Sequence, residues 1–217
     1  MVGTLAFEDL WPSQGGYDMN DVVVGYSTTF TVDKDNRNVA IQDVVTPLHS
    51  GGKHRSAFGY QLDIPVTAVK GVKIENGSST AGLEKNQDKA VVILFDDIEQ
   101  AVARGPVSVE IKLDGSLSMD KVTRKSLYNP FICVSDKGFV PGAVRKEIHL
   151  TIYPPTSLAD PYPFGRNDDK SSLDKAGNPI GPYYYATSEL YPFAIDLPVT
   201  DYRIPDEMVK IDVFYPY

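Results

Sequence analysis

Apolar residues that recur at every second position are the feature that most constrains how this chain can fold. Such alternation gives a segment one apolar and one polar face, as in a half-buried β-strand. The pattern occurs at 22–32, 58–64, 107–113, 148–152, 193–199 and 209–213. In the first of these segments we expect the even-numbered residues to face the core. Residues 90–95 are continuously apolar, which predicts a strand buried on both faces.

Few helices are expected beside these strands. The 16 prolines and 17 glycines would interrupt long helices. One short helix is predicted at 97–104, with Asp96 or Asp97 as its N-cap. The pattern predicts an all-β fold: a two-sheet, jelly-roll-like β-sandwich with long ordered loops and at most one or two short helices. A length of 217 residues suits one such domain, so we expect a single domain over 1–217.

Residues 155–187 form a different kind of segment. The segment is rich in proline, glycine, aspartate and tyrosine, and it shows no periodicity. Three consecutive tyrosines, Tyr183, Tyr184 and Tyr185, argue against disorder. We therefore predict an ordered excursion across the sandwich that its tyrosines anchor.

The candidate binding residues lie in a turn-rich loop that leads into the strand at 22–32. Four carboxylates and one asparagine amide fall within residues 8–21: Glu8, Asp9, Asp18, Asn20 and Asp21. Calcium takes six to eight oxygen ligands from carboxylates, amide side chains and carbonyls. No histidine or cysteine accompanies these residues, which disfavours zinc and copper.

A structural interpretation of the same loop stays open. Aspartate and asparagine are common in turns because they bond to their own backbone. The spacing also departs from an EF-hand, because position 12 counted from Asp18 is Thr29 and not glutamate. The sequence thus predicts either a calcium site or a hydrogen-bonded turn.

The loop also carries a family resemblance. It resembles the signature of the LruC domain family, also catalogued as DUF4842, a domain of unknown function. The matching residues are Phe7, Glu8, Asp9, Trp11, Pro12, Gly15, Tyr17, Asp18, Asn20 and Asp21. Further matches lie at 57–62, 128–132, 153–156, 164–165 and 215–216, so the resemblance covers nearly the whole chain.

The resemblance implies an exported, surface-associated β domain of Bacteroidetes-like bacteria, often on lipoproteins, with calcium at the acidic loop. It implies no known reaction. The chain departs from the signature at Gly16, where the family usually has an acidic residue. The predicted calcium site is therefore weaker than in the rest of the family.

Two other groups of residues compete for a functional role. The acidic residues Asp160, Asp168, Asp169 and Asp174 could complete the first site, bind a second ion, or lie in a solvated loop. The aromatic residues could form a platform for sugars or pack the long segment onto the sandwich: Trp11, Tyr162, Tyr183, Tyr184, Tyr185 and Tyr191. His149 alternates with apolar residues, so we expect it to point outward.

Composition and motifs narrow the function class. A formal net charge of -8 disfavours nucleic-acid partners. No apolar run approaches the roughly 18 residues of a membrane span. Cys133 lies among apolar residues and is interpreted as a small buried hydrophobe. No hydrolase, phosphate-loop or dinucleotide motif is present, so we expect no enzyme.

These observations predict a non-enzymatic, calcium-binding structural or adhesive module of a bacterial cell-surface or secreted protein. The alternative is a glycan-binding module that uses the calcium loop or an aromatic platform. The expected partner is a surface protein or a glycan. The expected location is extracellular or the outer-membrane surface. Residues 1–4 lack a basic and apolar signal region, so we expect any export signal to be absent from this chain.

Overall fold

A computed structural model describes residues 1–120 and 122–211. The strands are β1 (Val2–Phe7), β2 (Val22–Val32), β3 (Asn38–Ser50), β4 (Arg55–Pro65), β5 (Val69–Glu75), β6 (Gly82–Leu83), β7 (Lys89–Phe95), β8 (Val107–Leu113), β9 (Tyr128–Ser135), β10 (Lys146–His149) and β11 (Ala194–Leu197). The short helices are η1 (Val66–Ala68), α1 (Ile98–Arg104) and α2 (Arg124–Leu127).

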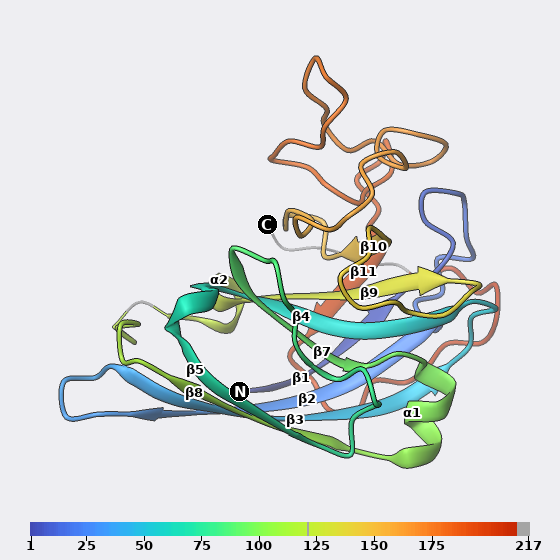
Figure 1. Ribbon diagram of the computed structural model, residues 1–217. Coiled ribbons are helices and arrows are strands. Elements are labelled where there is room, and N and C mark those ends of the chain that lie inside the picture. The colour runs from blue at the N-terminus through green and yellow to red at the C-terminus, as the bar shows by residue number, and fades with distance from the viewer. Residues whose placement is uncertain (121, 212–217) are drawn as a thin grey trace.

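The strands form two antiparallel sheets that face each other (Figure 1). The first has six strands in the order β11-β1-β2-β3-β8-β5, and the second has five in the order β10-β9-β4-β7-β6. The predicted all-β, two-sheet sandwich is therefore confirmed. Asp97 caps α1, because its carboxylate accepts a hydrogen bond from the backbone N–H of Gln100, as the sequence predicted.

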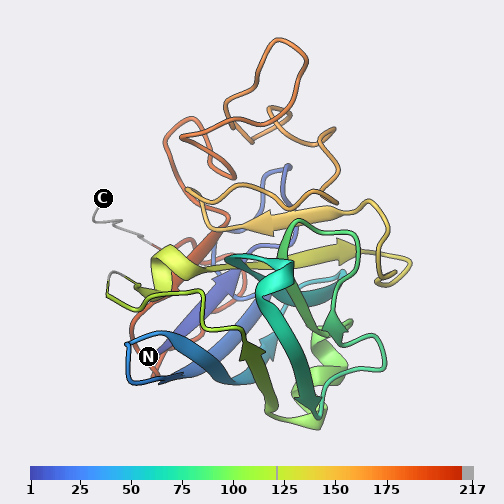
Figure 2. The same cartoon turned by 60° about the vertical axis from the view of Figure 1, so that its left-hand side comes forward.

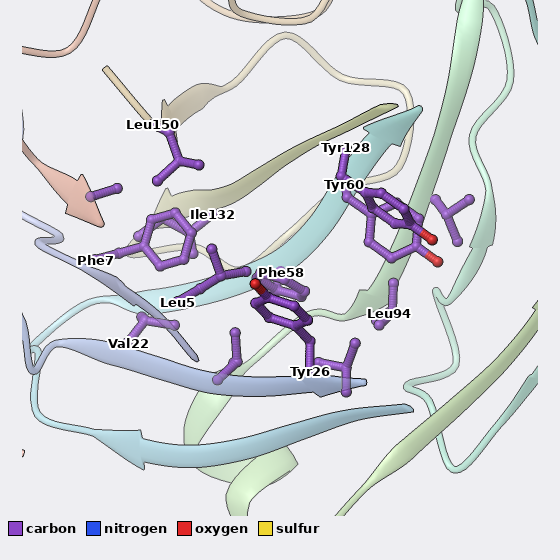
Figure 3. Close-up of a cluster of buried hydrophobic side chains, with 14 of the residues drawn as sticks. Leu5, Phe7, Val22, Tyr26, Phe58, Tyr60, Leu94, Tyr128, Ile132 and Leu150 are labelled. Carbon is purple, nitrogen blue, oxygen red and sulfur yellow. The ribbon is translucent and has the colours of Figure 1, made fainter. Parts of the chain in front are cut away.

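Side chains from both sheets meet in one apolar core (Figure 3). In β2, Val22, Val24 and Tyr26 point into this core, which confirms the predicted phase of the alternation for this part of the strand, whereas Val32 at its end is exposed. Every residue of 90–95 is buried, as expected for a strand covered on both faces. Val91 and Ile93 belong to a second, smaller cluster on the outer side of the five-stranded sheet.

The aperiodic segment packs beside β10, the edge strand of the five-stranded sheet. In Figures 1 and 2 the orange segment lies next to this strand. Tyr185 is fully buried, and its ring stacks on His149, which in turn stacks on Phe131. The segment is thus ordered and anchored through Tyr185, as predicted.

Three sequence-based expectations were wrong. The strand predicted at 148–152 ends at His149, and Ile152 is exposed. His149 does not point into solvent: it is fully buried and hydrogen-bonded to Asn129 and Glu147, because the long segment covers its strand. Residues 209–211 form no strand, since this part of the chain crosses the acidic loop instead of joining a sheet. The remainder of that predicted strand, including Val213, lies outside the described residues.

Candidate cation-binding site

The acidic loop joins β1 to β2, and strand pairing fixes its two ends. Phe7 pairs with Val22 in the antiparallel ladder, so Glu8 and Asp21 leave the sheet side by side. The loop, blue in Figures 1 and 2, lies beside the orange long segment in both views. The sequence fragments that carry the predicted ligands are thereby brought to one end of the sandwich.

Four of the five predicted ligands are almost fully buried. The exposed fractions of Glu8, Asp9, Asp18 and Asn20 are 1%, 1%, 4% and 2%, and Asp21 is partly buried. Acidic side chains are seldom buried to this extent unless a partner offsets the loss of hydration. The partners of each side chain therefore decide what the loop can do.

Glu8 shapes the loop through the backbone. Its two carboxylate oxygens accept hydrogen bonds from the N–H groups of Tyr17 (3.0 Å) and Met19 (2.7 Å). Tyr17 and Met19 both have left-handed backbone angles, with φ of 52° and 53°. Because non-glycine residues rarely adopt this conformation, Glu8 holds the loop in a shape that it would not take alone.

The three aspartates share one pattern. Oδ2 of Asp9 accepts a hydrogen bond from the backbone N–H of His54 (3.2 Å). Oδ2 of Asp18 accepts one from Met208 (2.6 Å), and Oδ2 of Asp21 accepts one from Asp9 (2.8 Å). Each carboxylate is therefore oriented through Oδ2, and these bonds do not use its other oxygen, Oδ1.

Asn20 supplies the most informative atom of the loop. Its amide nitrogen donates a hydrogen bond to the carbonyl oxygen of Pro205 (3.1 Å), which fixes the orientation of the amide. The other amide atom, Oδ1, is buried and has no hydrogen-bond partner among the described residues. An acceptor without a partner costs about 1–3 kcal/mol when it is buried, so this oxygen calls for a donor or a cation.

The carboxylates also repel one another. Burial, with a smaller contribution from the nearby Asp18, raises the pKa of Glu8 from 4.5 to about 7. Burial and the neighbouring Asp9 raise the pKa of Asp21 from 3.8 to about 8. The loop therefore binds protons near neutral pH, and a cation in the same place would remove the repulsion.

Sequence reasoning missed three residues of this site. A Cβ atom at Gly52 would lie 2.1 Å from Oδ2 of Asp9, and one at Gly51 would lie 2.9 Å from Oδ1 of Asn20. Neither glycine has a positive φ, so close approach explains why glycine occurs there. Lys146 donates a hydrogen bond to the carbonyl oxygen of Asp9 (3.3 Å). The adjacent glycines Gly51 and Gly52 are visible in the sequence, but from the sequence alone such a pair is interpreted as a turn.

The donor set fits a hard cation, although the side chains are not drawn together around one point. Within residues 1–120 and 122–211, no three His, Cys, Asp or Glu side chains converge closely enough to count as a metal-binding group. The candidate donors are the side-chain oxygens of Asp9, Asp18, Asn20 and Asp21, and among the described residues Oδ1 of Asn20 has no hydrogen-bond partner. Such oxygens suit calcium, and the like charges would draw together only around a cation.

The second acidic group has structural roles. Asp169 is fully buried and accepts a hydrogen bond from the indole N–H of Trp11 (2.8 Å). Asp168 accepts one from the hydroxyl of Tyr17. Asp160 and Asp174 accept hydrogen bonds from backbone N–H groups in exposed turns. Among the described residues, none of these four side chains is hydrogen-bonded to any of the five predicted calcium ligands of the acidic loop.

The predicted aromatic platform is mostly not on the surface. Trp11 and Tyr185 are fully buried and pack against each other, with ring centroids 4.9 Å apart. Tyr162 and Tyr183 are exposed on the long segment, with exposed fractions of 67% and 40%. The aromatic residues thus pack the long segment onto the acidic loop and do not form one continuous exposed row.

Taken together, the fold and the loop define an all-β sandwich with a buried, oxygen-rich loop between its first two strands. The chain belongs to the DUF4842 family, a domain of unknown function, whose profile matches residues 36–217. The acidic loop precedes the matched residues. No curated protein matches the chain.

A solved structure shows the same fold. It is the crystal structure of a protein described as a putative lipoprotein from Bacteroides ovatus, with 17% sequence identity and a TM-score of 0.63. The match covers 96% of this chain and 67% of that chain. Among the described residues of this chain, no helix is long and apolar enough to cross a membrane.

Proposed function

We propose that this domain is a calcium-stabilised structural or adhesive module of an exported bacterial protein, without enzymatic activity. Calcium would bind in the acidic loop to the side-chain oxygens of Asp9, Asp18, Asn20 and Asp21. Glu8 would hold the loop in shape through the N–H groups of Tyr17 and Met19.

The observation that carries the proposal is the unpaired amide oxygen of Asn20. It is buried in the acidic loop. A flip of the amide would break the hydrogen bond from the amide nitrogen to Pro205, so this oxygen keeps its position. A carboxylate cannot donate to this oxygen unless it is protonated. A cation would satisfy this oxygen and also neutralise the neighbouring carboxylates, whereas a water molecule could donate to the oxygen but would leave the repulsion between the carboxylates in place.

Calcium suits this donor set better than magnesium or zinc. Calcium accepts irregular coordination by six to eight oxygens, whereas magnesium demands a tight octahedron and gives up its water reluctantly. Zinc prefers nitrogen and sulfur ligands in tetrahedral sites, and the donors of this loop are oxygens. Backbone carbonyls and water would complete the shell.

The burial of the site supports a structural role over contact with a glycan. Asp9, Asp18 and Asn20 are covered by the protein itself, so an ion among them would not face a ligand in solution. The location outside the cytoplasm is proposed from the similarity to a structure described as a lipoprotein. Millimolar calcium outside the cell matches the weak affinities of extracellular modules.

The test is a melting curve with added calcium. With a dissociation constant near 0.1 mM, about 1 mM calcium stabilises the fold by roughly 1.4 kcal/mol, or about 3–6 °C for a domain of this size. Magnesium should do less. Asp18→Asn should remove most of the shift, and Asp114→Asn, in a distant exposed turn, should leave it unchanged.

The proposal fails if calcium at about 10 mM, far above the constants of extracellular modules, moves neither the melting curve nor a calorimetric titration. The acidic loop would then be a hydrogen-bonded turn that binds protons. A shift that is equal in Asp18→Asn and in the unchanged protein would place the ion elsewhere.

A further inference from the structure

The chain ends, within its described part, in a segment without strands or helices that crosses the acidic loop. We call residues 198–211 the strap. Its side chains Tyr202, Ile204 and Ile211 pack on a small apolar cluster on the outer side of the six-stranded sheet. The cluster consists of Ala6, Met19, Val23 and Ile195.

The strap bonds to four consecutive residues of the loop. The backbone N–H of Ile211 donates to the carbonyl of Tyr17 (3.0 Å), and that of Met208 donates to Oδ2 of Asp18 (2.6 Å). The hydroxyl of Tyr202 donates to the carbonyl of Met19 (3.0 Å).

The fourth bond involves the next residue of the loop, Asn20. Its amide nitrogen donates to the carbonyl of Pro205. Two of the proposed ligands, Asp18 and Asn20, are thus oriented by the strap itself.

We propose that cation binding in the acidic loop and docking of the strap are coupled, so that the strap closes over the loop when the site is filled. This inference rests on the proposed function. We call this coupled segment a latch: bound calcium favours docking of the strap on the loop, and removal of calcium favours its release.

The coupling follows from the contacts. The hydrogen bond from Met208 orients the Asp18 carboxylate. The hydrogen bond from the Asn20 amide nitrogen to Pro205 keeps the amide oxygen, Oδ1, free of the strap, so that this oxygen can bind the ion. Without the ion, the buried carboxylates repel one another, which destabilises the loop conformation to which the strap is hydrogen-bonded. By thermodynamic linkage, the free energy that strap docking adds to calcium binding equals the free energy that calcium binding adds to strap docking.

Gly16 gives this chain room for the latch. A Cβ atom at Gly16 would lie 3.4 Å from Cα of Met208 and 2.9 Å from Oδ2 of Asp18. The distance to Met208 is an ordinary van der Waals contact, but the distance to Asp18 is short, so a side chain here would press on the carboxylate that Met208 contacts. The absence of a side chain at this position lets the strap approach the proposed ligand closely.

Limited proteolysis of the full chain tests the latch. Arg203 and Lys210 are exposed trypsin sites within the strap, and Lys34, in the exposed turn between β2 and β3 at the end of β2 away from the acidic loop, serves as an internal reference. The reference removes any effect of calcium on trypsin itself. Cleavage after Arg203 and Lys210, relative to Lys34, should fall about tenfold in calcium compared with EDTA or magnesium.

A matched pair of variants tests the reverse direction. Tyr202→Phe removes the strap's hydroxyl bond to Met19, whereas Tyr153→Phe removes a hydroxyl bond to Lys125 far from the loop. Tyr202→Phe should weaken calcium binding in a calorimetric titration by at least about fivefold, the lower end of typical coupling. Tyr153→Phe should bind calcium like the unchanged protein.

The outcomes separate the latch from the proposed function. If calcium binds but the relative cleavage of the strap and the affinity of Tyr202→Phe do not change, the latch is overturned while the calcium site stands. If calcium does not bind at all, the proposed function fails and the latch fails with it.

Discussion

The indole N–H of Trp11 donates a hydrogen bond of 2.8 Å to Oδ1 of Asp169, and so joins two loops that are 158 residues apart in the chain. Asp169 is fully buried and also accepts hydrogen bonds from Gly165 (2.7 Å) and from the N–H and hydroxyl of Ser171 (3.2 and 2.9 Å). One carboxylate thus fixes the long segment on the acidic loop.

Removal of this carboxylate should destabilise the fold strongly. Asp169→Ala leaves four donors without their acceptor, and each unsatisfied buried group costs about 1–3 kcal/mol, so a loss of at least about 3 kcal/mol is expected. Urea unfolding measures it. Asp174→Ala, in an exposed turn, is the control and should cost less than about 1 kcal/mol. Equal losses would show that the Asp169 contacts do not hold the loops together.

The glycines beside the acidic loop allow a steric test. Gly52→Ala places a Cβ atom 2.1 Å from Oδ2 of Asp9, so the carboxylate or the backbone must move. Gly71→Ala is the matched control, because its Cβ atom would meet nothing within 4 Å. We expect Gly52→Ala to lower both the melting temperature and the calcium-induced shift, and Gly71→Ala to change neither. If calcium raised the melting temperature of Gly52→Ala as much as that of the unchanged protein, Gly52 would not border the calcium site.

The orientation of β2 can be checked with a pair of charges. Val24 is fully buried in the core, whereas Ser27 is exposed on the same strand. Val24→Asp should cost several kcal/mol, about what an unpaired buried charge costs, and Ser27→Asp should cost little. Similar unfolding midpoints for the two variants would contradict the assignment of faces.

Sequence patterning predicted several elements whose buried positions are apolar, although it missed the buried strands β1 and β9. The strand at 90–95 and the capped helix at 97–104 are of this kind. β3 was not predicted, because its core-facing side includes Asp43. Asp43 is buried where hydroxyl groups of Thr28, Tyr60 and Tyr128 donate to its carboxylate. No local pattern shows that a buried aspartate has such distant donors.

The candidate site divides in the same way. Glu8 and Asp21 could be assigned to one acidic loop from the sequence, because both lie in the turn-rich segment that leads into the strand at 22–32. Gly51, Gly52 and Lys146 could not, since they reach the loop only through tertiary packing. The path of the long segment over His149 also depends on distant contacts, which is why that side chain was assigned to the wrong environment.

The raised pKa values of Glu8 and Asp21 predict how the calcium response depends on pH. Their native pKa values, about 7 and about 8, exceed the ordinary values of 4.5 and 3.8. The native protein therefore holds protons that the unfolded chain has released. In EDTA, these two groups stabilise the fold most below about pH 4, and that contribution is lost as the pH rises through about 7 to 8.

Calcium should offset this loss, because it takes the place of the protons. The difference between the melting temperatures in calcium and in EDTA should therefore grow from about pH 6 to about pH 8. The comparison isolates the loop, since pH effects from distant groups occur in both buffers. A difference that stays constant or shrinks over this range would show that the ion does not displace these protons.

The most direct test of the calcium site is a high-resolution crystal structure of the domain grown with calcium. The account predicts an ion at about 2.3–2.6 Å from Oδ1 of Asn20 and from carboxylate oxygens of Asp9, Asp18 and Asp21. A water molecule at hydrogen-bonding distance from the Asn20 oxygen, with no ion among the carboxylates, would contradict it.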